Sequence, residues 1–490
     1  MARFHFRGFI SAALIAFTLF VSPIAFGQIR CLDLFLTASE SSPYATYRKD
    51  TLRGLEVMRN QETGLIQDKI VLVPQKKNGV SIRVMNPNTS ATNIGLDLLI
   101  QVGLLAEGHD RKQARFNIER TLIALEKMPF HRDSGLFFSW YETGGKINVA
   151  NADVSSVDNI HLALALWTVK ETFPRSTLAE RSGRLFDRMD FSQFYKFESG
   201  LMGGNMKYEN GLWVLERYEF ANLGSEARSI YALCWALGLL RKIEDADMPK
   251  KSAAALKAEI YEWKPNGINR PFLRTWDAGV FQRVLSDLLV GEQKYAPQFG
   301  VTLKNYSDYL IADGERRGIP GKAYHSASQF GYDNGGAFTQ GPAYEGKAGT
   351  PETVSTDHVD VNDPVLRARW NQVLTPHAAV ILAPTDPITY VEILSKMKTL
   401  RSGQNLMYRT GFGFMDGYHV KGVYQGQVVP IQISLNQAMI ALALEKIAAP
   451  DGMTASERAL KKNAQVTERL QQFYGPINRK LTDLMEKDRR

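Results

Sequence analysis

The amino-acid sequence predicts an all-α fold, an (α/α)6 toroid with short β excursions in its loops. Apolar residues recur at helical spacing in about twelve segments, which follow one another in pairs. The loops between these segments are rich in Trp, Tyr, Asp and Gly. The chain has no long internal repeat, which argues against an α-solenoid. In the toroid, inner helices bury an apolar core and the loops at one end form a cleft.

The elements follow in order along the chain. The helices predicted from apolar spacing span residues 46–60, 89–105, 112–127, 155–170, 176–190, 223–242, 250–261, 276–290, 303–317, 376–382, 387–398 and 433–447. A short strand pair is expected within 71–83, and residues 191–217 have no helical period and predict a β-like excursion or a long loop. Residues 318–372 are rich in Gly, Tyr and Asp, and a loop of that length in a compact domain is usually functional or flexible.

The N-terminus has the pattern of a secretory signal. Arg3 and Arg7 precede an apolar run at 9–20, and small residues at 25–27 offer a cleavage point before Gln28. The predicted division is a signal peptide at 1–27, a helical domain at 28–450 and a charged helical tail at 451–490, broken near Pro476. A periplasmic or secreted bacterial protein is expected, without stable membrane insertion after cleavage, because no later segment approaches about 18 uninterrupted apolar residues.

Composition excludes several classes of function. The formal net charge is +8, but Lys and Arg are interspersed with acidic residues, so no nucleic-acid partner is expected. Two cysteines, Cys31 and Cys234, cannot form a disulfide framework. The eight His are scattered and show no HxxxH spacing, so neither a metal nor another cofactor is expected. The sequence does not indicate a protein partner.

The stretch at 132–170 carries the clearest functional pattern. Trp140 and Tyr141 lie in an aromatic loop, and Asp158 follows in the first turn of a helix that Ser155 or Ser156 can cap. Aromatic rings stack on the apolar faces of sugars, and carboxylates bind hydroxyls or move protons. These residues therefore suggest a sugar pocket; the alternative is that the aromatics are core and Asp158 only caps the helix.

Eight segments in order are similar to one known family. They are TSATNIGLDLL (89–99), GLFFSWYET (135–143), VSSVDNIHLALAL (154–166), NLGSEARS (222–229), TWDAGVFQRVLS (275–286), GIPGKAYHSASQFGYDN (318–334), LTPHAAV (374–380) and the loop at 413–417. Together they resemble the glucoamylase-like domains of bacterial β-1,2-glucan enzymes, namely the cyclisation region of cyclic β-1,2-glucan synthases and the endo-β-1,2-glucanases. The resemblance implies the (α/α)6 fold and a carbohydrate cleft.

The resemblance also implies site residues. Glu226 matches within the SEAR motif and is the candidate general acid, with Asp158 or Asp333 as its partner carboxylate. Gln282 stands where the family has a Glu, and a second family Glu has no clear equivalent near Ala327 or Gln329. The residues expected to bind substrate are Trp140, Tyr141 and Trp276 by stacking, and Asn93, Arg228, Gln282, His377 and Asp416 by polar contacts.

The predicted function is a glycoside hydrolase or transglycosylase acting on a bacterial β-glucan or exopolysaccharide. Paired carboxylates would perform the acid/base chemistry, and their separation would decide between retention and inversion. We expect the carboxylates of Asp158 and Glu226 within about 12 Å of each other, with Gln282 on the same side. Two alternatives are a catalytically degenerate glycan-binding protein that assists polysaccharide export or processing, and a lyase using Tyr and His groups.

Overall fold

A computed structural model describes residues 42–75, 79–143, 148–275, 279–316, 328–329, 338–339, 373–419 and 425–487. Residues 43–490 form one compact unit. The predicted signal segment at 1–27, Trp276 and Asp333 lie outside the described residues. Within the described ranges, no helix is both long enough and apolar enough to cross a membrane.

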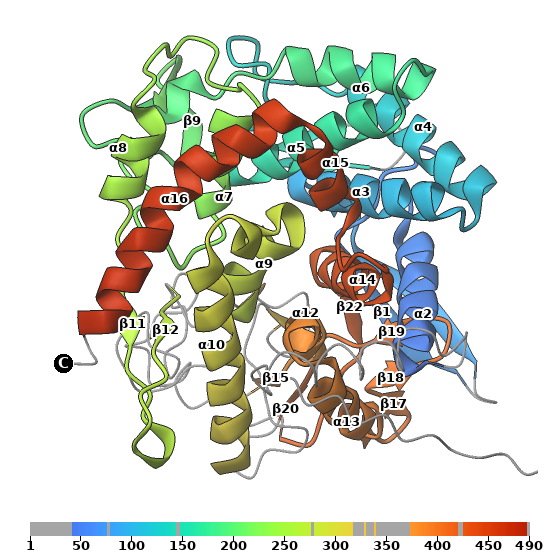
Figure 1. Cartoon of the computed structure of the whole chain (residues 1–490). Coiled ribbons are helices and arrows are strands. Elements are labelled where there is room, and N and C mark those ends of the chain that lie inside the picture. The colour runs from blue at the N-terminus through green and yellow to red at the C-terminus, as the bar shows by residue number, and fades with distance from the viewer. Residues whose placement is uncertain are drawn as a thin grey trace, which may run out of the picture. The chain divides into compact units, whose positions relative to one another are not determined.

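Six helices contact one another in sequence order. They are α3 (Ala91–Glu107), α5 (Ser156–Thr172), α7 (Arg228–Ala236), α9 (Val280–Val290), α12 (Pro376–Leu382) and α14 (Ser434–Ala448). Each packs against the next, and α14 packs against α3, so the contacts form a closed circuit. Figure 1 shows α14 and α12 beside each other, with α2 on the other side of α14.

The remaining helices mostly pack against this circuit. α2 (Pro43–Met58) packs on α14, α4 (Arg111–Lys127) on α3, α6 (Thr177–Asp187) on α5, α8 (Met248–Ala255) on α7, and α13 (Pro387–Lys398) on α12. α10 (Pro297–Arg316) packs on α16 (Ala464–Lys487), and α15 (Ala455–Lys462) contacts α3, α5 and α9. Short 3₁₀ turns are η1 (Ser192–Phe194), η2 (Pro265–Gly267), η3 (Glu292–Lys294) and η4 (Ala383–Thr385). The expected mainly helical architecture is confirmed.

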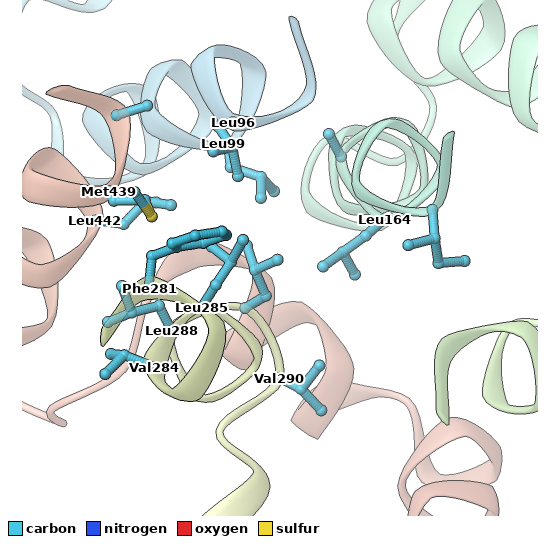
Figure 2. Close-up of a cluster of buried hydrophobic side chains, with 14 of the residues drawn as sticks. Leu96, Leu99, Leu164, Phe281, Val284, Leu285, Leu288, Val290, Met439 and Leu442 are labelled. Carbon is cyan, nitrogen blue, oxygen red and sulfur yellow. The ribbon is translucent and has the colours of Figure 1, made fainter. Parts of the chain in front are cut away.

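The apolar core lies between the helices of the circuit. Figure 2 shows Leu96 and Leu99 of α3 facing Phe281 of α9 and Met439 of α14. All four side chains are buried. α5 and α14 are apolar and buried on nearly every face, which is the pattern of helices surrounded by other elements.

Gly95 sets the distance between α3 and α5. A Cβ atom on Gly95 would lie 2.8 Å from the backbone nitrogen of Leu162 and 2.9 Å from the carbonyl oxygen of His161. Backbone atoms of a packed helix cannot move aside as a side chain can. Gly95 is therefore required for the close approach of the two helices.

Gly95→Ala should lower the free energy of unfolding by about 1–2 kcal/mol, because overpacking costs more than the helix propensity that Ala gains. Gly475→Ala is the matched control, since a Cβ there would meet no atom within 4 Å and the position lies inside α16. The control should be neutral or stabilising in urea unfolding. Equal effects of the two substitutions would contradict the packing role of Gly95.

Short strands lie between the helices. Three-stranded sheets are β2 (Val80–Asn86)–β1 (Lys69–Pro74)–β22 (Ile431–Ile433), β3 (Asn88–Thr89)–β4 (Trp140–Glu142)–β5 (Asn148–Asn151), β10 (Leu212–Leu215)–β9 (Asn205–Glu209)–β6 (Val154–Ser155), and β15 (Val373–Leu374)–β20 (Gly417–His419)–β21 (Val428–Val429). Two-stranded pairs are β7 (Tyr195–Lys196)–β8 (Leu201–Met202), β11 (Ile260–Tyr261)–β12 (Phe272–Leu273), β13 (Ser328–Gln329)–β14 (Phe338–Thr339), β16 (Arg401–Ser402)–β17 (Asn405–Leu406), and β18 (Tyr408–Arg409)–β19 (Gly413–Phe414). The strands of these sheets pair in the antiparallel direction.

The C-terminal segment differs in detail from the expectation. α16 runs without interruption through Pro476, where a break was predicted. Its buried apolar face includes Phe473, Tyr474 and Ile477, and the helix packs on α7, α8 and α10. This packing outweighs the hydrogen bond that a proline removes from a helix interior.

Candidate active site

Polar side chains gather at the N-terminal ends of the six circuit helices. They are Thr92 and Asn93 in the first turn of α3, Asp158 in α5, Glu226 immediately before α7, Gln282 in α9, His377 in α12 and Asn436 in α14. Five of these residues, Asp158, Glu226, Asn93, Gln282 and His377, belong to the set predicted from sequence.

Hydrogen bonds and electrostatic interaction connect the starts of α3, α5, α7 and α9. Thr92 Oγ1 donates to Asp158 Oδ1 at 2.5 Å, which joins α3 to α5. Helix α5 packs against α7, and the negative charge of Asp158 helps to raise the pKa of Glu226. Arg228 Nη1 donates to the carbonyl oxygen of Gln282 at 2.9 Å, which joins α7 to α9.

Two further connections involve α12 and α14. The backbone N–H of Ser434 in α14 donates to the carbonyl oxygen of Asp68 at 2.8 Å, and Asn93 Nδ2 in α3 lies 3.4 Å from Asp68 Oδ1. Asn436 Nδ2 donates to Asp416 Oδ1 at 2.8 Å, and β20, which follows Asp416, pairs with β15 just before α12. These contacts connect the starts of the circuit helices at one end of the helical unit.

Asp158 is held by two hydroxyl groups. Its backbone N–H donates to Ser155 Oγ at 3.2 Å, the N-cap interaction expected from the sequence. Burial raises the pKa of the Asp158 carboxyl group, while the bonds from the Thr92 and Ser155 side chains act in the opposite direction. The carboxyl group nevertheless belongs to a partly exposed residue.

A buried histidine, His161, contacts the Thr92 hydroxyl that bonds to Asp158. Thr92 Oγ1 lies 3.1 Å from His161 Nδ1, and burial lowers the pKa of His161 to about 4, so the ring is neutral near pH 7. Because the single proton of the Thr92 hydroxyl goes to Asp158, His161 Nδ1 must carry the proton that it shares with Thr92. The sequence analysis missed both residues; the spacing of His161 three residues after Asp158, on the same helical face, was the available signal.

Glu226 lies in a turn that is fixed on both sides. Ser225 Oγ donates to Glu226 Oε2 at 3.0 Å, and the Glu226 carbonyl oxygen accepts from Ser229 Oγ at 2.8 Å and from Ser286 Oγ at 3.2 Å. Burial raises the pKa of the Glu226 carboxyl group, and the charge of Asp158 adds to that shift. Like Asp158, Glu226 remains partly exposed.

Arg228 is a structural clamp under this turn. It pairs with Glu292 through Nε at 2.9 Å and Nη2 at 2.6 Å, and its other N–H groups donate to the carbonyl oxygens of Ser225, Gln282 and Arg283. All five donors of the guanidinium group are thus used within the protein, and the side chain is fully buried. Arg228 therefore has no N–H group left for the sugar hydroxyl that the sequence analysis assigned to it.

The predicted aromatic residues separate into two kinds. Tyr141 is fully buried, and its hydroxyl donates to the carbonyl oxygen of Pro129 and accepts from the N–H of Phe138, both at 2.7 Å. This places Tyr141 in the core, where its ring cannot stack on a ligand. Trp140 is partly exposed in β4, opposite Asn151 of β5.

Four predicted polar residues are buried at the same end. Asn93, Gln282, His377 and Asp416 are each less than 4% exposed. Burial lowers the pKa of His377 to about 3, so the ring is neutral near pH 7. Within the described ranges neither ring nitrogen of His377 has a hydrogen-bond partner. These side chains are less accessible than Asp158 and Glu226, which are partly exposed.

No protein-family model and no curated protein matches the sequence. An endo-β-1,2-glucanase from Chitinophaga pinensis, solved with sophorotriose and glucose, is 14% identical; the match covers 88% of this chain and 97% of that one, with a TM-score of 0.62. An endo-β-1,2-glucanase from Talaromyces funiculosus, solved with sophorose, is 12% identical over 93% and 90% of the two chains, with a TM-score of 0.67. A provisionally assigned glucoamylase from Bacteroides caccae is 16% identical over 87% and 97%, with a TM-score of 0.63. The chain therefore has the fold of the endo-β-1,2-glucanases and glucoamylase-like proteins, as its sequence motifs indicated.

Proposed function

We propose that the protein is a glycoside hydrolase acting on a bacterial β-glucan. One observation carries the proposal: Asp158 and Glu226 stand at the starts of the contacting helices α5 and α7, both with raised pKa values and both partly exposed. Most glycosidases use such a pair of carboxyl groups, one as general acid and the other as base or nucleophile. The fold shared with endo-β-1,2-glucanases supports β-1,2-glucan as the first substrate to test.

The environments of the two carboxyl groups suggest their roles. We assign Glu226 as the proton donor and Asp158 as the ionised partner, because the charge of Asp158 helps to raise the pKa of Glu226. Glu226 gives that proton to the glycosidic oxygen as the bond to the anomeric carbon breaks. Asp158 either takes a proton from the water that forms the new bond or forms a glycosyl ester that water then hydrolyses. Asp333 remains an alternative partner for Glu226. The anomer released first distinguishes inversion from retention.

The finer expectations about the fold and the location extend this proposal. The closed contact circuit, with outer helices on most of its members, supports an (α/α)6 toroid whose inner layer is α3, α5, α7, α9, α12 and α14. The signal-like segment at 1–27 supports export to the periplasm or the medium.

Thr92→Val should lower kcat/KM about tenfold, because it removes a hydrogen bond to a charged carboxylate. That bond favours the ionised form of Asp158, so its loss should move the acidic limb of the pH–kcat/KM profile to higher pH. Thr92→Ser, which keeps the hydroxyl, should retain the limb. An unchanged profile in the Val variant would remove Thr92 from the site.

The function itself is tested by incubating the purified wild-type protein with linear β-1,2-, β-1,3- and β-1,4-glucans. We expect new reducing ends and shortened chains with β-1,2-glucan. Binding without any reducing ends would favour the glycan-binding alternative, for which Gln282 in place of a family Glu is the motivation. Unsaturated products that absorb in the near ultraviolet would instead identify a lyase.

A further inference from the structure

The β9–β10 hairpin is fastened to the start of the Asp158 helix. β9 pairs with β6, with Ser155 opposite Asn205. Ser156 Oγ, in the first turn of α5, lies 2.8 Å from the carbonyl oxygen of Gly203 and 2.9 Å from that of Gly204. These bonds fix the base of the hairpin within two residues of Asp158.

The return strand of the same hairpin leads to Glu226. After β10, the backbone N–H of Glu216 donates to the carbonyl oxygen of Asn205, and that of Phe220 donates to Met202. The chain then reaches Glu226 within six residues of Phe220. The base of the hairpin therefore lies at the first turn of the Asp158 helix, and its return segment continues into the turn that holds Glu226.

This segment exposes two large aromatic rings. Tyr208 is 60% exposed and Tyr218 is 53% exposed. Single exposed apolar residues are common on protein surfaces, but these two flank a candidate site on one continuous segment. The feature therefore calls for an explanation beyond chance exposure.

Both tyrosine rings are backed by other side chains. Tyr208 lies 5.4 Å from Trp213 between ring centroids, and Trp213 stacks on Phe138 at 5.9 Å with an interplanar angle of 18°. Tyr218 meets Phe220 edge-on at 5.1 Å. Rings held in this way lose little conformational entropy when a ligand binds.

The absence of a side chain at Gly204 brings Tyr218 close to the site. A Cβ atom on Gly204 would lie 3.0 Å from Tyr218 Cδ1, so the tyrosine ring covers the glycine. Gly204 is itself bonded to Ser156. Tyr218 is therefore placed next to the first turn of α5.

Charged groups alternate with the aromatic rings. Lys207 pairs with Glu216 at 2.5 Å, and Lys196 pairs with Glu219 at 3.3 Å. Aromatic faces fit the C–H faces of sugar rings, and charged groups beside them can hydrogen-bond to the hydroxyls at the ring edge. An aromatic surface with such a border matches a neutral polysaccharide better than a purely apolar partner.

We propose that Tyr208 and Tyr218 form an accessory sugar-binding subsite that holds a β-glucan chain beside the Asp158–Glu226 pair. The inference rests on the proposed function and adds to it a preference for long chains. Tyr208 is paired with Trp213 across the hairpin, and the five residues from Trp213 to Tyr218 span at most about 17 Å when extended. A chain of several sugar units can therefore contact both rings, and a trisaccharide at the carboxyl groups leaves fewer sugar units for them.

The test compares two substrate lengths, long-chain β-1,2-glucan and sophorotriose. In Tyr208→Ala, and more strongly in Tyr218→Ala, the ratio of kcat/KM on the long chain to that on sophorotriose should fall about tenfold. Native electrophoresis in gels containing the long glucan should show weaker retardation of the same variants. Tyr218→Phe keeps the ring and should restore most of the retardation.

Phe116→Ala is the matched control, since Phe116 is an aromatic residue of α4 that is 50% exposed. It should leave the length ratio at the wild-type value. If the tyrosine variants behave like the control while the wild type cleaves β-1,2-glucan, the subsite is wrong and the proposed function stands. If the wild type neither cleaves nor binds any glucan, both fail. Thermal unfolding of each variant separates lost binding from lost folding.

Discussion

Glu226→Gln should reduce hydrolysis of β-glucan by about 10²–10⁴-fold, the contribution typical of a general acid. The amide keeps the size of the side chain and can still contact Ser225 Oγ, but it has no acidic proton to give to the leaving oxygen. The measurement is kcat/KM from reducing-end release. Affinity for the glucan should persist, because the substitution removes a proton and not a binding surface.

The pH profile adds a second readout for the same substitution. Burial and the nearby charge of Asp158 raise the pKa of Glu226, so the wild type should keep its proton donor to a higher pH than an ordinary carboxyl group would. Activity should decline as pH rises through that pKa. In Glu226→Gln the residual activity should lack this alkaline limb.

Glu226→Gln should also stabilise the protein. A carboxyl group whose folded pKa is raised binds more protons in the folded state than in the unfolded state, so stability falls as pH rises from the ordinary carboxyl pKa through the raised one. The neutral amide does not suffer this loss. The unfolding midpoint of the variant should therefore exceed that of the wild type at pH 7 and approach it in acid.

Glu244→Gln supplies the control, because Glu244 is exposed on the surface. It should change neither turnover nor the unfolding midpoint measurably. Glu226→Gln with wild-type turnover would remove Glu226 from catalysis, whatever its effect on stability.

Helix positions followed from the sequence where local signals agree. The helix expected at 89–105 is α3 (Ala91–Glu107), and the one expected at 155–170 is α5 (Ser156–Thr172). In both, a serine at the N-cap accepts from the backbone N–H three residues later, and apolar residues repeat at helical spacing. Local sequence is sufficient when capping and periodicity point to the same boundary.

The helix that follows Glu226 was predicted too long. The expected range of 223–242 shrinks to α7 (Arg228–Ala236) because Gly224 packs directly on the carbonyl oxygen of Arg274, and Gly238 has a positive φ of 69°. The first contact depends on a distant segment that apolar spacing cannot reveal. It is also what leaves Glu226 in a turn rather than inside a helix.

The supporting residues of the site were harder to predict than the carboxyl groups. Asp158 and Glu226 stand in recognisable motifs, but Thr92 is 66 residues from Asp158 and 69 from His161 along the chain. Glu292 is 64 residues from its partner Arg228. Such pairs form only after the helices pack, and no local pattern announces them.

Glu292→Gln should produce the largest loss of stability. Glu292 is fully buried between two arginines, pairing with Arg228 at 2.6 Å and with Arg283 at 3.4 Å. Burial and the charge of Arg228 already lower the pKa of Arg283 to about 10. Among the described residues, Glu292 is the carboxylate that pairs with both guanidinium groups. Its removal leaves two buried positive charges close to each other.

We expect Glu292→Gln to lower the free energy of unfolding by about 3–5 kcal/mol, the range for breaking a buried ion pair by removing one partner. Asp247→Asn is the control: its pair with Lys250 is exposed at both ends, so its loss should cost less than about 1 kcal/mol. Urea unfolding of both variants measures the difference.

Because Arg228 also holds the carbonyl oxygens of Ser225 and Gln282, a loosened clamp should lower turnover even where Glu292→Gln remains folded. If Glu292→Gln lowers the free energy of unfolding no more than Asp247→Asn does, the ion pairs of Glu292 with Arg228 and Arg283 do not hold the helix starts in place.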